Sequence, residues 1–189
     1  MLTGEKILEN KLEYLKLLTV LDVDLTDFSR YLDAVDYFNK PASTQYFRAY
    51  QGGLCQYALD LYYELSQLAN AYFPGKYTQE DIIKVALFKD LYRAELYEEY
   101  NKNVQENGNW VSVKAYKYRD NRPTFGDLGF SSYMVAKHFF DFTDEQIEAI
   151  TQADTRDSYA GDIHDIMRSY PLVPLTKMAD IVASYLEQN

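Results

Sequence analysis

Along most of this chain, apolar residues recur at close to the 3.6-residue period of an α-helix, and this pattern limits the possible folds more than any other feature. It predicts helices near 4–20, 27–39, 54–72, 79–93, 128–140, 144–153, 161–170 and 172–187. Two of these segments begin with a capping box, in which a threonine and the residue three positions later satisfy each other's backbone N–H groups. The pairs are Thr78 with Asp81 and Thr143 with Gln146. A mainly α fold follows from this pattern.

One segment departs from the helical period. In YEEYNKNVQENGNWVSVKAYKY, β-branched and aromatic residues alternate with polar ones on both sides of Asn107-Gly108, a dipeptide typical of a two-residue hairpin turn. We therefore expect a small β-hairpin at about 98–118. The 189 residues contain no internal repeat and no low-complexity linker, so a single domain over 1–189 is predicted.

The chain is strongly acidic, with a formal charge of −10 at pH 7. Nucleic-acid phosphates and anionic lipids are bound mainly by lysine and arginine, so direct binding to nucleic acid or to a membrane surface is not expected. A protein partner with a basic surface fits this charge better.

No apolar run reaches the roughly 18 residues that a membrane span needs. A lone cysteine, Cys55, excludes an internal disulfide and a zinc–thiolate site, and it fits a reducing compartment such as the cytoplasm.

The stretch LFKDLYR places three charged residues inside an apolar helical segment. Because IIKVALFKDLYR is otherwise almost entirely apolar, Lys89, Asp90 and Arg93 must face either solvent or a polar site. Lys89 and Arg93 are four residues apart, so they would share one face of a continuous helix. The pattern indicates a candidate functional site at this position.

Four stretches resemble, in the same order, motifs of the HD-superfamily metal-dependent phosphohydrolases. PASTQYFRAYQGGLCQYALDLYYEL is similar to the family's Pro-Ala-x-x-x-x-His-x-x-Tyr-x-Gly-Gly-Leu-x-x-His segment, and IIKVALFKDLYR lies where the family has Leu-x-His-Asp-x-x-Lys. TDEQIEAITQAD resembles its Thr-Asp-Glu-Glu…Ala-Ile-x-x-His stretch, and PLTKMADIVASYL resembles its closing Leu-x-x-Ala-Asp helix. The resemblance covers about 41–187. It implies an HD-domain helical bundle in which the hairpin is an insertion and the helices of 1–40 pack on the bundle.

In that family, histidines and carboxylates from separate helices bind one or two divalent metals, which activate water for attack on a phosphate ester or anhydride. The resemblance maps metal-ligand positions, of which only the two aspartates keep the family's residue, onto Tyr57, Lys89, Asp90 and Asp180. It maps other family histidines onto pocket positions at or near Phe47, Asp127 and Ala153. A degenerate domain that uses no metal and no other cofactor is therefore expected.

Lys89 suggests what replaces the metal. A protonated lysine has no lone pair to offer a metal, but its charge can stand in for the metal's charge, so Lys89 is predicted to pair with Asp90, Asp180 or both. Tyr57 is expected to fill the volume that a metal and its waters would occupy, or to donate a hydrogen bond there. Arg93 stands where the family has a lysine, so Lys89 and Arg93 are also candidates for binding an anion.

The chain contains 19 tyrosines, several of them on more than one face of an acidic helix. Exposed tyrosine beside carboxylates is typical of a protein interface. We therefore expect a catalytically inactive HD-like protein that binds another protein, and the compact relatives found in bacteriophage genomes suggest a phage-encoded modulator of a factor in the host cytoplasm. Two alternatives stay open: a nucleotide sensor that keeps the pocket, and a divergent metal-dependent phosphohydrolase.

Overall fold

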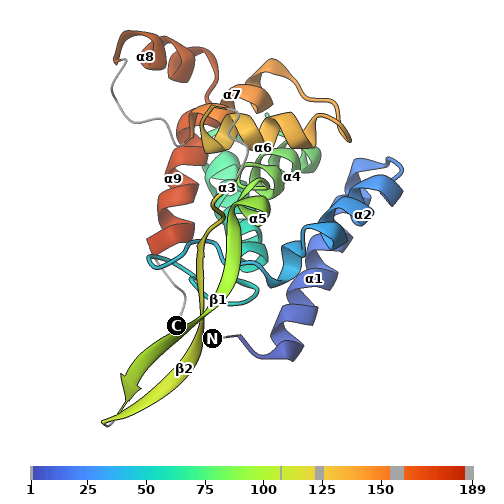
Figure 1. The fold of residues 1–189 in the computed structure, drawn as a ribbon. Coiled ribbons are helices and arrows are strands. Elements are labelled where there is room, and N and C mark those ends of the chain that lie inside the picture. The colour runs from blue at the N-terminus through green and yellow to red at the C-terminus, as the bar shows by residue number, and fades with distance from the viewer. Residues whose placement is uncertain (1, 107, 122–125, 154–159, 186–189) are drawn as a thin grey trace.

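The computed structural model describes residues 2–106, 108–121, 126–153 and 160–185. Helices form most of this part and a long β-hairpin extends away from them (Figure 1), so the predicted class, mainly α with a small hairpin, is confirmed. The helices are α1 (Gly4–Leu18), α2 (Thr26–Ala34), α3 (Gly53–Tyr72), α4 (Gln79–Phe88), α5 (Arg93–Leu96), α6 (Leu128–Ala136), α7 (Asp144–Gln152), α8 (Ala160–Ser169) and α9 (Leu172–Tyr185). The strands are β1 (Tyr97–Glu106) and β2 (Asn109–Tyr118), and the short 3₁₀ helices are η1 (Thr19–Leu21) and η2 (Tyr37–Asn39). Within these ranges, no helix combines the length and the apolar character that a membrane span requires.

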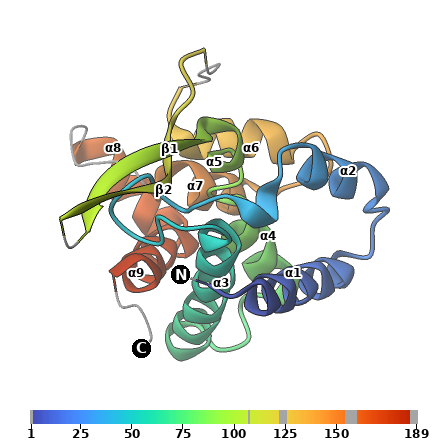
Figure 2. The ribbon, with the colours of Figure 1, turned by 60° about the horizontal axis from the view of Figure 1, so that its bottom comes forward.

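Helix α3 is the central element of the helical body. It packs against α9, α4 and α1, and Figure 2 shows it between α9 and α1. The buried side chains that repeat along it at helical spacing are Leu54, Ala58, Leu61 and Leu65. Helix α7 packs in turn against α4, α6 and α9. The apolar side of α3 is therefore the surface around which the other helices assemble.

The N-terminal helices contribute aromatic side chains to the same core. The ring of Phe28 in α2 lies 4.9 Å from the ring of Phe140 and 5.4 Å from that of Phe88, in edge-to-face arrangements that stabilise beyond their buried area. Tyr14 of α1 is fully buried, and its hydroxyl donates to the carbonyl oxygen of Leu87 at 3.2 Å. The segment before residue 40 therefore shares its core with the rest of the body.

The ends of the helices follow local chemistry. Both predicted capping boxes are confirmed, at Thr78 and at Thr143. The helix predicted to run on through Arg93 is wrong, because α4 ends at Phe88 and the N–H groups of the next turns bond to carbonyls three residues back instead of four. This tighter winding moves Lys89 and Arg93 off a shared helical face and places Asp90 beside Arg93.

Two glycines begin α3 where the preceding loop passes close to it. Gly52 has φ 81°, in the left-handed region that favours glycine. A β-carbon on Gly53 would lie 2.2 Å from the carbonyl oxygen of Arg48 and 3.0 Å from its Cβ. The same loop is joined to α3 by the N–H of Leu54, which donates to the carbonyl oxygen of Lys40 at 2.9 Å, and the Arg48 carbonyl accepts from the N–H of Ala42 at 3.1 Å. The close approach therefore requires glycine at position 53.

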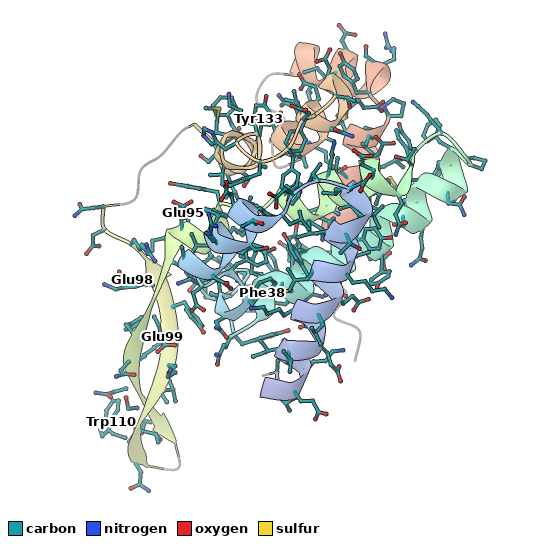
Figure 3. The ribbon with its side chains drawn as sticks, turned by 90° about the vertical axis from the view of Figure 1, so that its right-hand side faces the viewer. Phe38, Glu95, Glu98, Glu99, Trp110 and Tyr133 are labelled. Carbon is teal, nitrogen blue, oxygen red and sulfur yellow. The ribbon has the colours of Figure 1, made fainter. Side chains whose placement is uncertain are left out.

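The β-hairpin forms an arm, Tyr97–Tyr118, that extends from the helical body (Figures 1 and 2). Its strands pair in register from Tyr97 opposite Tyr118 to the residues that flank the turn, in which Gly108 has φ 85°. The predicted hairpin at about 98–118 is confirmed. Tyr97 is buried at the base, but most of the described side chains from Glu99 outward are exposed, including Trp110 near the free end (Figure 3).

We predict that Gly53→Ala destabilises the fold by roughly 2 kcal/mol, because overpacking costs about 1–3 kcal/mol and the clashing atom belongs to the backbone. Gly4→Ala is the matched control, since a β-carbon there meets nothing within 4 Å and alanine favours the helix. Urea denaturation measures both variants. Equal free energies of unfolding for the two would contradict the close approach.

Candidate functional site

A buried ion-pair network connects three helices around Lys89, the C-cap residue of α4, whose side chain is 0% exposed. Its ammonium donates to Asp90 Oδ2 at 3.0 Å, to Asp180 Oδ1 of α9 at 3.4 Å and to the hydroxyl of Tyr57 of α3 at 3.4 Å. The Tyr57 hydroxyl also donates to Asp180. The predicted pairing of Lys89 with Asp90, Asp180 or both is therefore confirmed, and it involves both. We refer to Tyr57, Lys89, Asp90, Arg93 and Asp180 as the lysine cluster.

Arg93 connects the lysine cluster to the loop before α3 and to the base of the arm. Its Nε donates to Asp90 Oδ1 at 2.8 Å, and its Nη1 donates to the carbonyl oxygen of Ala42 and to the hydroxyl of Tyr97, both at 3.2 Å. The guanidinium also lies 5.7 Å from the centre of the Phe47 ring. Phe47, predicted as a pocket residue, therefore packs against the lysine cluster.

Among the residues that the structure describes, two basic side chains of the lysine cluster face two aspartates. Burial alone would raise the pKa of Asp90, but the charges of Arg93 and Lys89 and the hydrogen bonds of Tyr57 and Lys89 hold that pKa well below its usual range. Asp90 therefore stays ionised although it is buried.

These residues do not fit a divalent metal. Metal ligands must offer lone pairs, whereas the protonated Lys89 offers none and lies within 3.4 Å of both carboxylates. Tyr57 is buried, and its ring lies 5.5 Å from that of Phe47, so aromatic side chains fill the space beside the ammonium. In the part of the chain that the structure describes, no group of three or more His, Cys, Asp or Glu side chains is placed to hold a metal ion.

A cavity of about 200 Å³ lies at the base of the arm, next to the lysine cluster. Asp127, a predicted pocket position, lines it together with Arg93, Tyr97 and Tyr118. The carboxylate of Asp127 caps α6 by accepting from the N–H of Phe130 at 2.8 Å. The cavity therefore brings an arginine, a carboxylate and three tyrosines together, the third being Tyr92.

The two predicted anion-binding residues differ in their access to this cavity. Arg93 lines it but donates to protein acceptors through Nε and Nη1, whereas Lys89 is fully enclosed by its partners. Ala153, the last predicted pocket position, is the C-cap residue of α7 and is buried outside the lining of this cavity. The structure therefore brings all of the predicted positions except Ala153 to the lysine cluster or to the cavity beside it.

A second group of polar contacts lies where α1 and α3 pack side by side. The sequence patterns did not indicate it. Arg48, whose side chain is 2% exposed, donates to Asp60 of α3 at 2.6 Å, and the hydroxyl of Tyr63 donates to Glu13 of α1. Burial raises the pKa of Asp60 and the charges of Glu64 and Glu13 add to this, although Arg48 opposes the shift. We refer to Glu13, Asp60, Tyr63 and Glu64 as the acidic face. Glu13 and Tyr63 are 50 residues apart, so no local signal could have revealed the contact.

Comparison of the chain with family models, with curated proteins and with solved structures gives no match. The resemblance to HD-superfamily phosphohydrolases therefore stays a prediction that rests on the sequence stretches quoted above. The geometry of the lysine cluster is independent of it. Whatever the family, this chain holds a buried lysine between two carboxylates.

We predict that Lys89→Met lowers the free energy of unfolding by about 3 kcal/mol, because it keeps the length of the side chain but leaves the buried Asp90 with Arg93 as its remaining cation and removes the ammonium from the partly buried Asp180. Lys6→Met is the control, since Lys6 pairs with Glu9 on the surface with both side chains at least half exposed, and such pairs contribute little. Urea denaturation near neutral pH measures both. An unchanged midpoint for Lys89→Met would show that the ammonium does not compensate the carboxylates.

The lowered pKa of Asp90 predicts a loss of stability in acid. Unfolded aspartate titrates near pH 4, so below that pH the unfolded chain binds a proton that the native chain does not, and the free energy of unfolding falls. Asp90→Asn removes this linkage, so its stability, although lower at neutral pH, should vary less between about pH 5 and pH 3. Urea denaturation across this range measures the slope, with the exposed Asp165→Asn as the control. Parallel curves for the wild type and Asp90→Asn would contradict the prediction.

Proposed function

We propose that this protein acts by binding another protein and not by catalysis. The observation that carries the proposal is the Lys89 ammonium, which lies within 3.4 Å of both carboxylates that the HD-like pattern would supply as metal ligands. A metal that activates water needs the lone pairs of those ligands, and here they face a fixed cation instead. The chain is then a degenerate HD-like domain that keeps the helical scaffold for another use.

The acidic face is the proposed recognition surface. It concentrates three carboxylates beside the exposed Tyr63, on a chain with a formal charge of −10. Aromatic side chains are enriched at interfaces, and complementary charge speeds the encounter with a basic partner. The proposed partner is therefore a protein with a basic surface. The resemblance to compact proteins of bacteriophage genomes makes a host factor in the cytoplasm the proposed class.

One observation favours a second candidate function, a nucleotide sensor. The cavity at the base of the arm is lined by Arg93, which could face a phosphate. Its volume of about 200 Å³ is below the roughly 300–1,000 Å³ of typical small-molecule sites, and Lys89 is enclosed. A divergent phosphohydrolase would further require a metal to displace Lys89 from Asp90 and Asp180. Protein binding therefore accounts for the acidic face, and it requires no rearrangement of the lysine cluster.

We expect the immobilised protein to retain a partner from a bacterial lysate, and the double variant Glu13→Gln/Glu64→Gln to retain at least about tenfold less, because the loss removes charge complementarity at the interface. Asp27→Asn/Asp165→Asn is the matched control, since it also removes two charges, both on exposed side chains outside the acidic face. Quantitative mass spectrometry of the retained proteins gives the ratio. Equal retention by the two double variants would reject the acidic face as the recognition surface.

Thermal denaturation separates the rival functions. The chelator-treated protein is heated alone and with Mn²⁺, Mg²⁺, Zn²⁺ or a panel of nucleotides, because a ligand of the native state raises the melting temperature by mass action. Stabilisation by a metal would favour the phosphohydrolase, and stabilisation by a nucleotide alone would favour the sensor. The proposed binding function requires neither.

A further inference from the structure

The arm lacks the support that a β-hairpin of its length requires. Two-stranded hairpins are marginally stable in water, and the outer edges of both strands present backbone groups that another strand can pair with. The ion pairs Glu98–Lys117 and Glu99–Lys114, at 2.8 Å and 2.9 Å, join the strands near the base, but their side chains are exposed. A neighbouring strand along one outer edge would therefore complete a more stable sheet.

The free end of the arm carries an exposed tryptophan in an uncharged setting. Trp110 is 74% exposed, and Glu106 is the only charged residue in the sequence from 103 to 113. The arm as a whole contains three acidic and three basic residues, so its formal charge is zero on a chain of −10. The end of the arm therefore carries a single carboxylate, and the arm, which has no net formal charge, can approach a second copy of this acidic chain without strong repulsion.

An apolar groove of about 380 Å³ lies between α2 and the end of α6. Its lining residues are Tyr31, Met134, Val135, His138 and Phe139. Methionine adapts its shape to an inserted side chain, and the volume suits a large aromatic ring. The hydroxyl of Tyr31 donates to Glu95 at 2.9 Å, and Glu95 lies two residues before β1. The groove is therefore close to the base of the arm, where Figure 3 labels Glu95, and Tyr133, labelled in the same view, belongs to α6.

The arm is long enough to connect these two features in a symmetric pair. Ten residues of strand extend about 33 Å, so two arms that lie antiparallel along an outer edge place the end of each at the base of the other. Trp110 lies on the same face of the arm as Glu99 and Tyr116. At the base, the same face carries Tyr97 and Tyr118, which line the cavity beside the start of α6. A twofold axis perpendicular to the sheet preserves its faces, so the partner's tryptophan would point toward the α6 side.

We propose that two copies of this chain pair through their arms, with Trp110 of each copy seated in the groove of the other. A buried aromatic side chain contributes about 150–250 Å², so two reciprocal contacts give roughly 300–500 Å². Stable interfaces bury about 1,200–2,000 Å², so the proposed dimer requires the edge-to-edge contact of the arms to supply the remainder. The contact is the same in both directions, so the assembly closes as a dimer.

The test uses the fact that Trp110 is the only tryptophan in the chain, so intrinsic fluorescence reports on this residue alone. Sedimentation of the full-length protein over a concentration series should show a monomer–dimer equilibrium, and the fluorescence should shift to shorter wavelength as the dimer forms. Trp110→Ala and Met134→Glu should each raise the dissociation constant at least about tenfold, since a buried tryptophan is the commonest interface hot spot. Tyr46→Ala is the matched control, because Tyr46 is 81% exposed and lies outside the arm and the groove.

A mixture of variants tests the reciprocal exchange. A Trp110→Ala chain keeps its groove and a Met134→Glu chain keeps its tryptophan, so the mixed dimer retains one of the two contacts that each homodimer has lost. It should therefore form at lower concentration than either homodimer. A wild type that is monomeric at every concentration, a dimer that Trp110→Ala leaves unchanged, or a mixture that pairs no better than its components would each overturn the proposal. Because Trp110 is exposed in the single chain, the alanine variant should keep the wild-type unfolding transition, so loss of folding does not explain a monomer.

Discussion

The ammonium of Lys89 is the interaction on which the rest of this structure depends. It lies in the core where α3, α4 and α9 meet, and it compensates Asp90 and Asp180, which would otherwise repel each other. A buried ion pair of this kind adds little net stability when complete, but loss of one partner is costly. Arg93 extends the same network to the base of the arm, so the position of the arm is coupled to the packing of the three helices.

The parts of this fold that the sequence predicts are those decided within a few residues. The caps at Thr78 and Thr143 depend only on residues three positions away. A lysine within an apolar stripe is expected to be buried and therefore to form an ion pair with a carboxylate. The end of α4 at Phe88 could not be predicted, because the tighter turn that follows is held by an ion pair and by contacts with the distant loop before α3. The acidic face and the groove depend on how helices pack, which no local pattern encodes.

The molecule separates its charge from its exposed apolar surface. Carboxylates gather on the helical body, where α1 and α3 lie side by side, while the arm has no net formal charge and ends beside an exposed tryptophan. Charge acts over about 8 Å in physiological salt and apolar surface acts only on contact, so the two surfaces suit different partners. Binding at one of them need not compete with binding at the other.

The distances in sequence that the lysine cluster spans have a consequence for synthesis of the chain. Asp180 follows Tyr57 by 123 residues and Lys89 by 91, so neither side chain can contact Asp180 until α9 has been synthesised. The arm has no such delay, since its strands are adjacent in sequence and hairpins form within microseconds. A ribosome that is still making α8 therefore presents an arm that can already be paired, on a body in which Lys89 has Asp90 as a partner but does not yet have Asp180. During this interval the nascent chain is most exposed to proteases and to premature contact with its neighbours.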